Sequence, residues 1–183
     1  MNILPHTPPE IIGQFGSADF DSLNKAVQQG SLRGGFYNIQ TGKGENEREA
    51  LLLEALSPLI EMIISRESKI KLGINFRVES SEVPQGKQQR PGLPHTDRDP
   101  FDKRPIYTVA DRMPTEFYAR RHLLFHHKNG GDDFVETRRQ YGFLDILQHK
   151  PETVVRFKRQ RHVSPHNLSS EPVFRTWIRA VVF

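Results

Sequence analysis

The 183-residue chain contains no cysteine. Disulfide bonds, thiolate metal ligands and cysteine nucleophiles are therefore excluded, and any metal ion must be held by His, Asp or Glu. The sequence also lacks a run of about 18 apolar residues, which a membrane-spanning helix needs. At its N-terminus no basic segment precedes an apolar one, as a secretory leader would require. We therefore expect a cytoplasmic protein without a membrane partner.

The composition is that of an ordinary folded domain. Hydrophobic residues make up 36% of the chain and charged residues 26%, so we expect one compact domain over residues 1–183. The net charge is +4, with basic clusters at Arg120-Arg121, at Arg138-Arg139 and between Arg156 and Arg161. Such clusters suit nucleic acid or an anionic substrate, but they also protect strand edges from pairing, so charge alone does not choose a function.

The first third of the chain has the spacing of helices. Thr7-Pro8-Pro9-Glu10 combines a capping residue with first-turn prolines, which predicts the start of a short helix. Apolar residues at helical spacing predict a second helix over Asp19–Gln29 and a longer one over Asn46–Glu67. Ser57-Pro58 should kink or split the longer helix. Residues 1–68 are thus expected to be mainly helical support.

The period changes to two after residue 68. Lys69–Val78 alternates apolar and polar residues, which predicts a half-buried strand, and a loop rich in proline and glycine follows over Val83–Pro105. The later predicted strands are Ile106–Val109, Glu116–Tyr118, Leu123–His126, Phe134–Val135, Phe143–Ile146, Thr153–Phe157 and Phe174–Val182. Helices followed by a run of strands indicate an α+β fold, with a β-rich core over residues 69–183.

The β-rich part carries a candidate metal site. His95 and Asp97 lie two residues apart on the loop, and His162 follows a predicted strand. Two imidazoles and one carboxylate on one face of a divalent metal leave the opposite face open, which suits Fe(II) that must take up a co-substrate and O₂. Arg175 comes thirteen residues after His162. Its planar guanidinium could hold a carboxylate of the co-substrate through parallel hydrogen bonds.

The order His-x-Asp, His, Arg resembles that of the Fe(II)/2-oxoglutarate-dependent oxygenases (dioxygenases), over about residues 69–183. His162-Val163-Ser164-Pro165 is similar to the family's second-histidine segment, and Arg175 has the position of its arginine. The resemblance implies a double-stranded β-helix, a cupin-like jelly roll, with N-terminal helices packed on it. It also implies that His95, Asp97 and His162 ligate Fe(II), and that Arg175 binds 2-oxoglutarate.

The resemblance also implies a reaction. The expected enzyme is a hydroxylase that oxidises an unactivated C–H bond of a small polar metabolite, such as an amino acid, and releases succinate and CO₂. Asp97 favours hydroxylation, because halogenases similar to this family have a small residue there. A peptide or carrier-tethered substrate is the first alternative. A non-catalytic basic β-domain that binds nucleic acid is an alternative of another class, and a cupin-like barrel with a structural metal is a third.

Several assignments stay open at this point. His166 is a rival to His162 as third ligand, although Pro165 and Asn167 indicate that the strand has ended before His166. Arg179 lies four residues after Arg175, so strand alternation puts both on one face. Arg179 could share the co-substrate, contact the substrate or pair at the surface.

Two further expectations concern contacts. Some family members have a tyrosine before the His-x-Asp segment that contacts the co-substrate, and in this chain Thr115, Arg77 or Tyr107 could take its place. The apolar residues over Leu51–Ile64 exceed what one helix face can bury, so they could include a homodimer surface.

Overall fold

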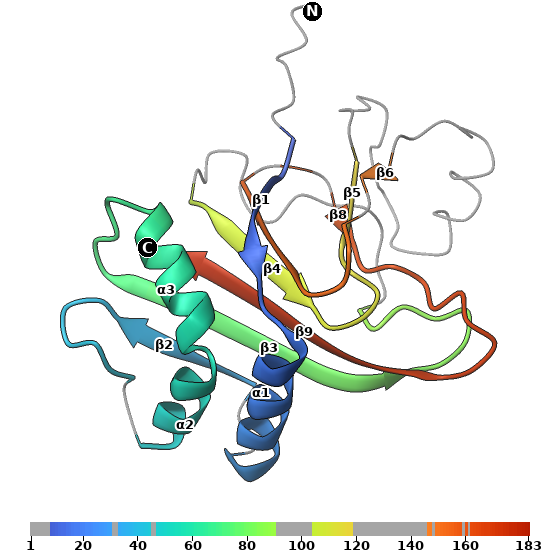
Figure 1. Cartoon of the computed structure of the whole chain (residues 1–183), viewed down its shortest axis with the longest axis horizontal. Coiled ribbons are helices and arrows are strands. Elements are labelled where there is room, and N and C mark those ends of the chain that lie inside the picture. Colours follow the sequence, from blue (N-terminus) through green and yellow to red (C-terminus); the bar gives the residue numbers. More distant parts are fainter. Residues whose placement is uncertain are drawn as a thin grey trace, which may run out of the picture.

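The computed structural model describes most of the chain, whose path is drawn in Figure 1. The described residues are 8–30, 33–44, 47–90, 104–118, 146–147, 149–158, 160 and 162–183. Within these ranges the helices are α1 (Ser17–Gly30), α2 (Glu47–Ala55) and α3 (Ser57–Arg66). None of them is both long and apolar enough to cross a membrane.

The strands of the described ranges form two antiparallel sheets. They are β1 (Glu10–Gln14), β2 (Gly34–Asn38), β3 (Gly73–Val83), β4 (Ile106–Ala110), β5 (Glu116–Tyr118), β6 (Ile146–Leu147), β7 (Thr153–Phe157), β8 (His162–Val163) and β9 (Val173–Val182). The six-stranded sheet has the order β1-β7-β4-β9-β3-β2, and the three-stranded sheet has the order β6-β5-β8. The predicted α+β class is confirmed, and two sheets of this kind are compatible with a β-sandwich.

β9 is the central strand of the larger sheet. It pairs with β3 over its whole length, from Ile74 opposite Val182 to Val83 opposite Val173, and with β4 on its other edge. Because side chains alternate along a strand, β9 presents two different faces. Its alternating residues from Ile178 to Val182 belong to the core cluster shared with the helices.

The three helices lie over one face of the larger sheet, as Figure 1 shows. Their leucines and isoleucines are buried against the sheet, among them Leu23, Leu52, Leu56, Leu59 and Ile63. Burying each such side chain contributes about 1.5–3 kcal/mol. The helical part therefore covers one face and leaves the other face of β9 to the three-stranded sheet.

The space between the two sheets has an apolar end and a polar end. The apolar end is the cluster Ile106, Phe117, Val155, Phe157 and Val181. Toward the start of β9 the same face carries Arg175 and Trp177, both of which contact residues on or near the smaller sheet. A polar site between two sheets is thus built on the face opposite the helices.

The helix predictions have mixed outcomes. The helix over Asp19–Gln29 is confirmed as α1, and the longer helix is split into α2 and α3 just before Ser57-Pro58, as predicted. The prediction that a short helix starts at Thr7–Glu10 is wrong, because the chain from Glu10 onward forms strand β1. β1 pairs with β7, and its β-branched Ile11 and Ile12 suit that edge position.

Most described strands agree with the prediction. β4, β5, β7 and β9 match within one residue at each end. β3 starts at Gly73 instead of Lys69 and continues to Val83, and Leu72 is 61% exposed. The predicted strands Leu123–His126 and Phe134–Val135, and all but the last residue of Phe143–Ile146, lie outside the described residues.

Strand β2 was not predicted, because Gly34 and Gly35 open it and glycine is depleted in strands. The structure explains the glycine at residue 34. A Cβ atom there would lie 2.5 Å from the backbone oxygen of Phe76, so only glycine permits this approach of β2 to β3.

Fewer apolar side chains over Leu51–Ile64 are exposed than the sequence predicts. Most of these side chains are buried in the core, while Leu51 is 48% exposed and Ile64 is 36% exposed. A dimer surface here stays a prediction.

Glu67, directly after α3, ties the helices to the sheet. Its carboxylate accepts hydrogen bonds from the Tyr107 hydroxyl at 2.7 Å and from Arg156 Nε at 2.6 Å. Burial raises the pKa of Glu67, but the bonds from Arg156 and Tyr107 outweigh burial, and the pKa lies below its ordinary value. The ionised form of Glu67 therefore stabilises the fold.

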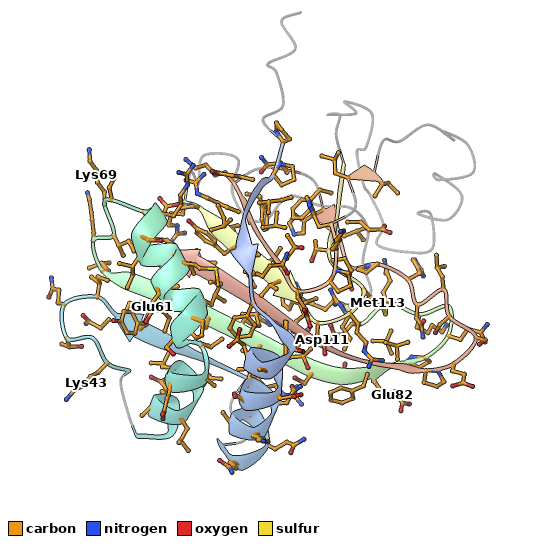
Figure 2. The ribbon with its side chains drawn as sticks, in the orientation of Figure 1. Lys43, Glu61, Lys69, Glu82, Asp111 and Met113 are labelled. Carbon is orange, nitrogen blue, oxygen red and sulfur yellow. The ribbon has the colours of Figure 1, made fainter. Side chains whose placement is uncertain are left out.

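Glu67→Gln should lower the free energy of unfolding by about 1.5–3 kcal/mol at pH 7, the range for hydrogen bonds to a charged group. Because the folded-state pKa is depressed, this stabilisation is present above the ordinary value of 4.5 and is lost as pH falls through the folded-state pKa. Urea unfolding at neutral and at strongly acid pH measures the difference. Glu61→Gln, an exposed change on α3 (Figure 2), is the control. If Glu67→Gln lowered the free energy of unfolding equally at both pH values, this account would be contradicted.

Candidate functional site

Arg175 is the largest fully buried side chain in the described part of the chain, at 1% exposure. Its Nε donates to the backbone oxygens of Arg112 at 3.1 Å and Met113 at 2.9 Å. Its Nη1 donates to Gln89 Oε1 at 2.5 Å and to Ser164 Oγ at 3.5 Å. Its Nη2 is buried and has no hydrogen-bond partner among the described residues. One corner of the guanidinium is thus left with two unused donors.

The charge of Arg175 has no direct counter-ion among the described residues. The four groups that accept its hydrogen bonds are backbone carbonyls, an amide and a hydroxyl. Burial lowers the pKa of Arg175 to about 10, while the charges of Asp111 and Glu79 act in the opposite direction. The side chain is still protonated at neutral pH. A buried cation without an ion pair is costly, so this position favours an anionic ligand.

The turn after β4 supplies two of these contacts. Asp111 accepts a hydrogen bond from the Thr176 backbone N–H at 2.8 Å, which joins the turn to β9. Met113 has φ of 50°, a left-handed conformation that costs a non-glycine residue about 1 kcal/mol or more. Figure 2 shows Asp111 and Met113 together beyond the end of β4. This strained turn aims two successive carbonyls at the guanidinium.

His162 lies on β8 and is 8% exposed. Its ring packs against Phe157 at 4.9 Å and Phe117 at 5.9 Å between centroids. Its Nδ1 is 3.1 Å from the backbone oxygen of Gln160. The carbonyl can only accept, so this contact assigns the proton to Nδ1 and the lone pair to Nε2, the arrangement typical of metal-ligating histidines.

His162 and Arg175 face the same space between the sheets. Ser164 comes two residues after His162, directly after the end of β8. Ser164 Oγ in turn contacts the guanidinium of Arg175. The segment His162-Val163-Ser164 therefore links the imidazole to the buried cation.

The rival histidine has a different setting. His166 Nδ1 lies 3.0 Å from the backbone oxygen of Gly86, and His166 forms an isolated bridge with Gln88. The next residue, Asn167, is 1% exposed and bonds to the Val83 carbonyl. His166 thus belongs to the junction of two loops, whereas His162 is packed among aromatic rings.

Thr115 lies directly before β5, and its hydroxyl accepts a hydrogen bond from Trp177 Nε1 at 3.3 Å. Trp177 is 7% exposed and is the only tryptophan of the chain. The guanidinium of Arg90 lies 5.0 Å from its ring, and Arg90 also pairs with Glu79 at 3.6 Å. Thr115 therefore supports Trp177, and Trp177 lies next to Arg175 on the same face of β9.

Arg179 pairs in register with Thr108 on one side and with Arg77 on the other. By alternation it lies on the face of Arg175 and Trp177. Tyr107 lies on the helix face, where its hydroxyl bonds to Glu67, so it is removed from the candidates for the co-substrate contact.

His95 and Asp97 lie outside the described residues. In the described ranges, no three His, Asp or Glu side chains are grouped so that they could hold a metal ion. The expected ligand set contributes only His162 to these ranges. The three-ligand site stays a prediction.

Sequence reasoning missed the groups that hold Arg175. Two of them are backbone carbonyls, at Arg112 and Met113, and these carry no signature in the side chains. Gln89 is a common residue type in a loop. Ser164 was the only one with a signal, because it stands inside the segment already singled out for His162.

Thr115→Val should destabilise the fold by about 1–3 kcal/mol, because a nearly isosteric side chain leaves the buried Trp177 N–H without its acceptor. Thr115→Ser keeps the hydroxyl and should recover most of that loss. Urea unfolding followed by the emission of Trp177 measures both. Equal stability of Thr115→Val and wild type would contradict the supporting role of Thr115.

Comparisons with known proteins do not identify a family. The sequence matches no family model, and it matches no curated protein. The geometry around Arg175 and His162 and the order of residues in the chain are the features that point to a function.

Proposed function

We propose that this protein is an Fe(II)- and 2-oxoglutarate-dependent oxygenase that hydroxylates a C–H bond of a small polar metabolite, an amino acid or a related compound. The observation that carries the proposal is the buried guanidinium of Arg175, which is held by neutral groups and has Nη2 unused within the described ranges. The proposal includes the cytoplasmic location expected from the sequence.

The path of the chain supports the jelly-roll part of the proposal. After β4 in the larger sheet the chain enters the smaller sheet with β5 and β6, returns with β7, crosses again with β8 and returns with β9. From β4 to β9, strands that are neighbours in sequence thus lie in opposite sheets, except for β5 and β6. Jelly rolls are antiparallel double sheets in which the chain crosses repeatedly between the sheets.

The setting of Arg175 suits the far carboxylate of 2-oxoglutarate. A carboxylate oxygen could accept from Nη2, and the guanidinium is already fixed by Gln89, Ser164 and the turn at Met113. Little side-chain entropy would be lost on binding, because these contacts hold the group before the ligand arrives. Exclusion of water strengthens the ion pair.

The histidine on β8 suits a metal ligand. His95, Asp97 and His162 would hold Fe(II), with the Gln160 carbonyl orienting the His162 ring through Nδ1, so that Nε2 would be the nitrogen that ligates the metal. When bound, the iron would supply the activation of O₂ that couples decarboxylation of 2-oxoglutarate to hydroxylation. Phe117 and Phe157 pack beside His162 and exclude water from that side.

The surroundings of Trp177 favour a charged small substrate. The guanidinium of Arg90 lies beside the Trp177 ring and pairs with Glu79. Arg179 lies on the same face of the sheet as Trp177. Cations beside a carboxylate can orient a molecule that carries both charges, as an amino acid does. A peptide or a carrier-tethered compound is the alternative substrate.

Arg175→Met should raise the KM for 2-oxoglutarate by roughly 100-fold, the effect of losing a charge-assisted hydrogen bond worth about 3 kcal/mol. Arg175→Lys keeps the charge without the planar fork and should lie between Arg175→Met and wild type. The measurement is succinate released from 2-oxoglutarate with Fe(II), O₂ and ascorbate as the reductant, but without substrate.

Arg33→Met is the matched control for Arg175→Met. The Arg33 side chain is exposed, directly before β2, and within the described ranges it has no contact with the groups that hold Arg175, so this change should leave the KM unaltered. An unchanged KM in Arg175→Met would contradict the proposal. So would the absence of succinate release from folded wild-type protein.

A further inference from the structure

Gln89 contacts both the backbone and the side chain of Arg175. Its Nε2 donates to the Arg175 carbonyl at 2.9 Å and lies within reach of the Glu79 carbonyl at 3.2 Å and Ser81 Oγ at 3.1 Å. Its Oε1 accepts from Arg175 Nη1 at 2.5 Å. The opposite orientation of the amide would set its NH₂ against a guanidinium that can only donate. The network therefore fixes which end of Gln89 faces Arg175.

The neutral charge of Gln89 is the significant property. A buried guanidinium is ordinarily paired with a carboxylate, and glutamate has nearly the same shape as glutamine. Among the described residues, the nearby carboxylates are engaged elsewhere. Glu79 pairs with Arg77 at 2.5 Å and with Arg90 at 3.6 Å, and Asp111 accepts the Thr176 N–H. An amide at residue 89 orients Arg175 without neutralising it.

We propose that Gln89 is a positioning residue that holds the Arg175 guanidinium in place and, by being uncharged, keeps its positive charge available to a carboxylate ligand. The identity of that ligand as 2-oxoglutarate rests on the proposed function. A carboxylate at residue 89 would occupy Nη1 with a full ion pair and would repel the incoming anion. The residue thus sets the affinity of the site without touching the reacting atoms.

The test compares Gln89→Glu, Gln89→Met and a control, Gln28→Glu, which makes the same charge change at an exposed position on α1. Two probes are titrated, succinate with metal-free protein and 2-oxoglutarate with protein loaded with Mn(II). Binding is followed by the emission of Trp177, the single tryptophan, two residues from Arg175. Uncoupled succinate release with Fe(II), O₂ and ascorbate as the reductant gives KM and kcat for 2-oxoglutarate.

Gln89→Glu should weaken binding of both probes by roughly 10- to 100-fold, the effect of one competing charged hydrogen bond. Its KM should rise similarly, while kcat at saturation stays nearly unchanged. Gln89→Met removes the amide without adding charge, so it should weaken binding less than Gln89→Glu does. Gln28→Glu should bind both probes as wild type does.

Other outcomes separate this inference from the proposed function. Wild type that binds succinate but not 2-oxoglutarate with Mn(II) would refute the oxygenase, while the succinate series still tests Gln89. Equal binding by Gln89→Glu and wild type would overturn the role of Gln89. Equal weakening in Gln89→Glu and Gln89→Met would overturn the part played by its charge, and failure of wild type to bind either probe would overturn both proposals.

Discussion

Burial of the Arg175 guanidinium between two sheets is the constraint on which the rest of the site depends. The side chain is 1% exposed, yet every described group that accepts its hydrogen bonds is neutral. Burial of an uncompensated cation costs free energy, and pairing with an anion offsets part of that cost. In the proposed function, the carboxylate of 2-oxoglutarate is that anion.

Packing and hydrogen bonds around Arg175 offset the free-energy cost of burying its charge. The opposite face of β9 is packed on the helices through Ile178, Ala180 and Val182, which fixes the strand. The turn at Met113 adopts a strained conformation and presents two carbonyls to Nε. Gln89 holds the backbone and the guanidinium together. Apolar burial on one face therefore supports a polar and less favourable arrangement on the other.

The spacing of apolar residues predicted the helices and strands whose apolar faces pack directly into the core. α1, the division between α2 and α3, and strand β9 were predictable because their apolar spacing repeats over many residues. β1 and β2 were not, since their strand state depends on partners distant in sequence. Residue order singled out Arg175 and His162, but it could not show that Gln89 and two carbonyls hold the guanidinium. His95 and Asp97 lie outside the described residues, so their role as ligands stays a prediction.

The most direct test of the central claim is the visible absorption spectrum of metal-free protein, titrated without oxygen first with Fe(II) and then with 2-oxoglutarate. We expect the weak charge-transfer band of iron chelated by a 2-oxo acid. The band should be absent in Asp97→Ala and should need much more 2-oxoglutarate in Arg175→Met. A folded wild-type protein that gives no band at any concentration of 2-oxoglutarate would contradict the account.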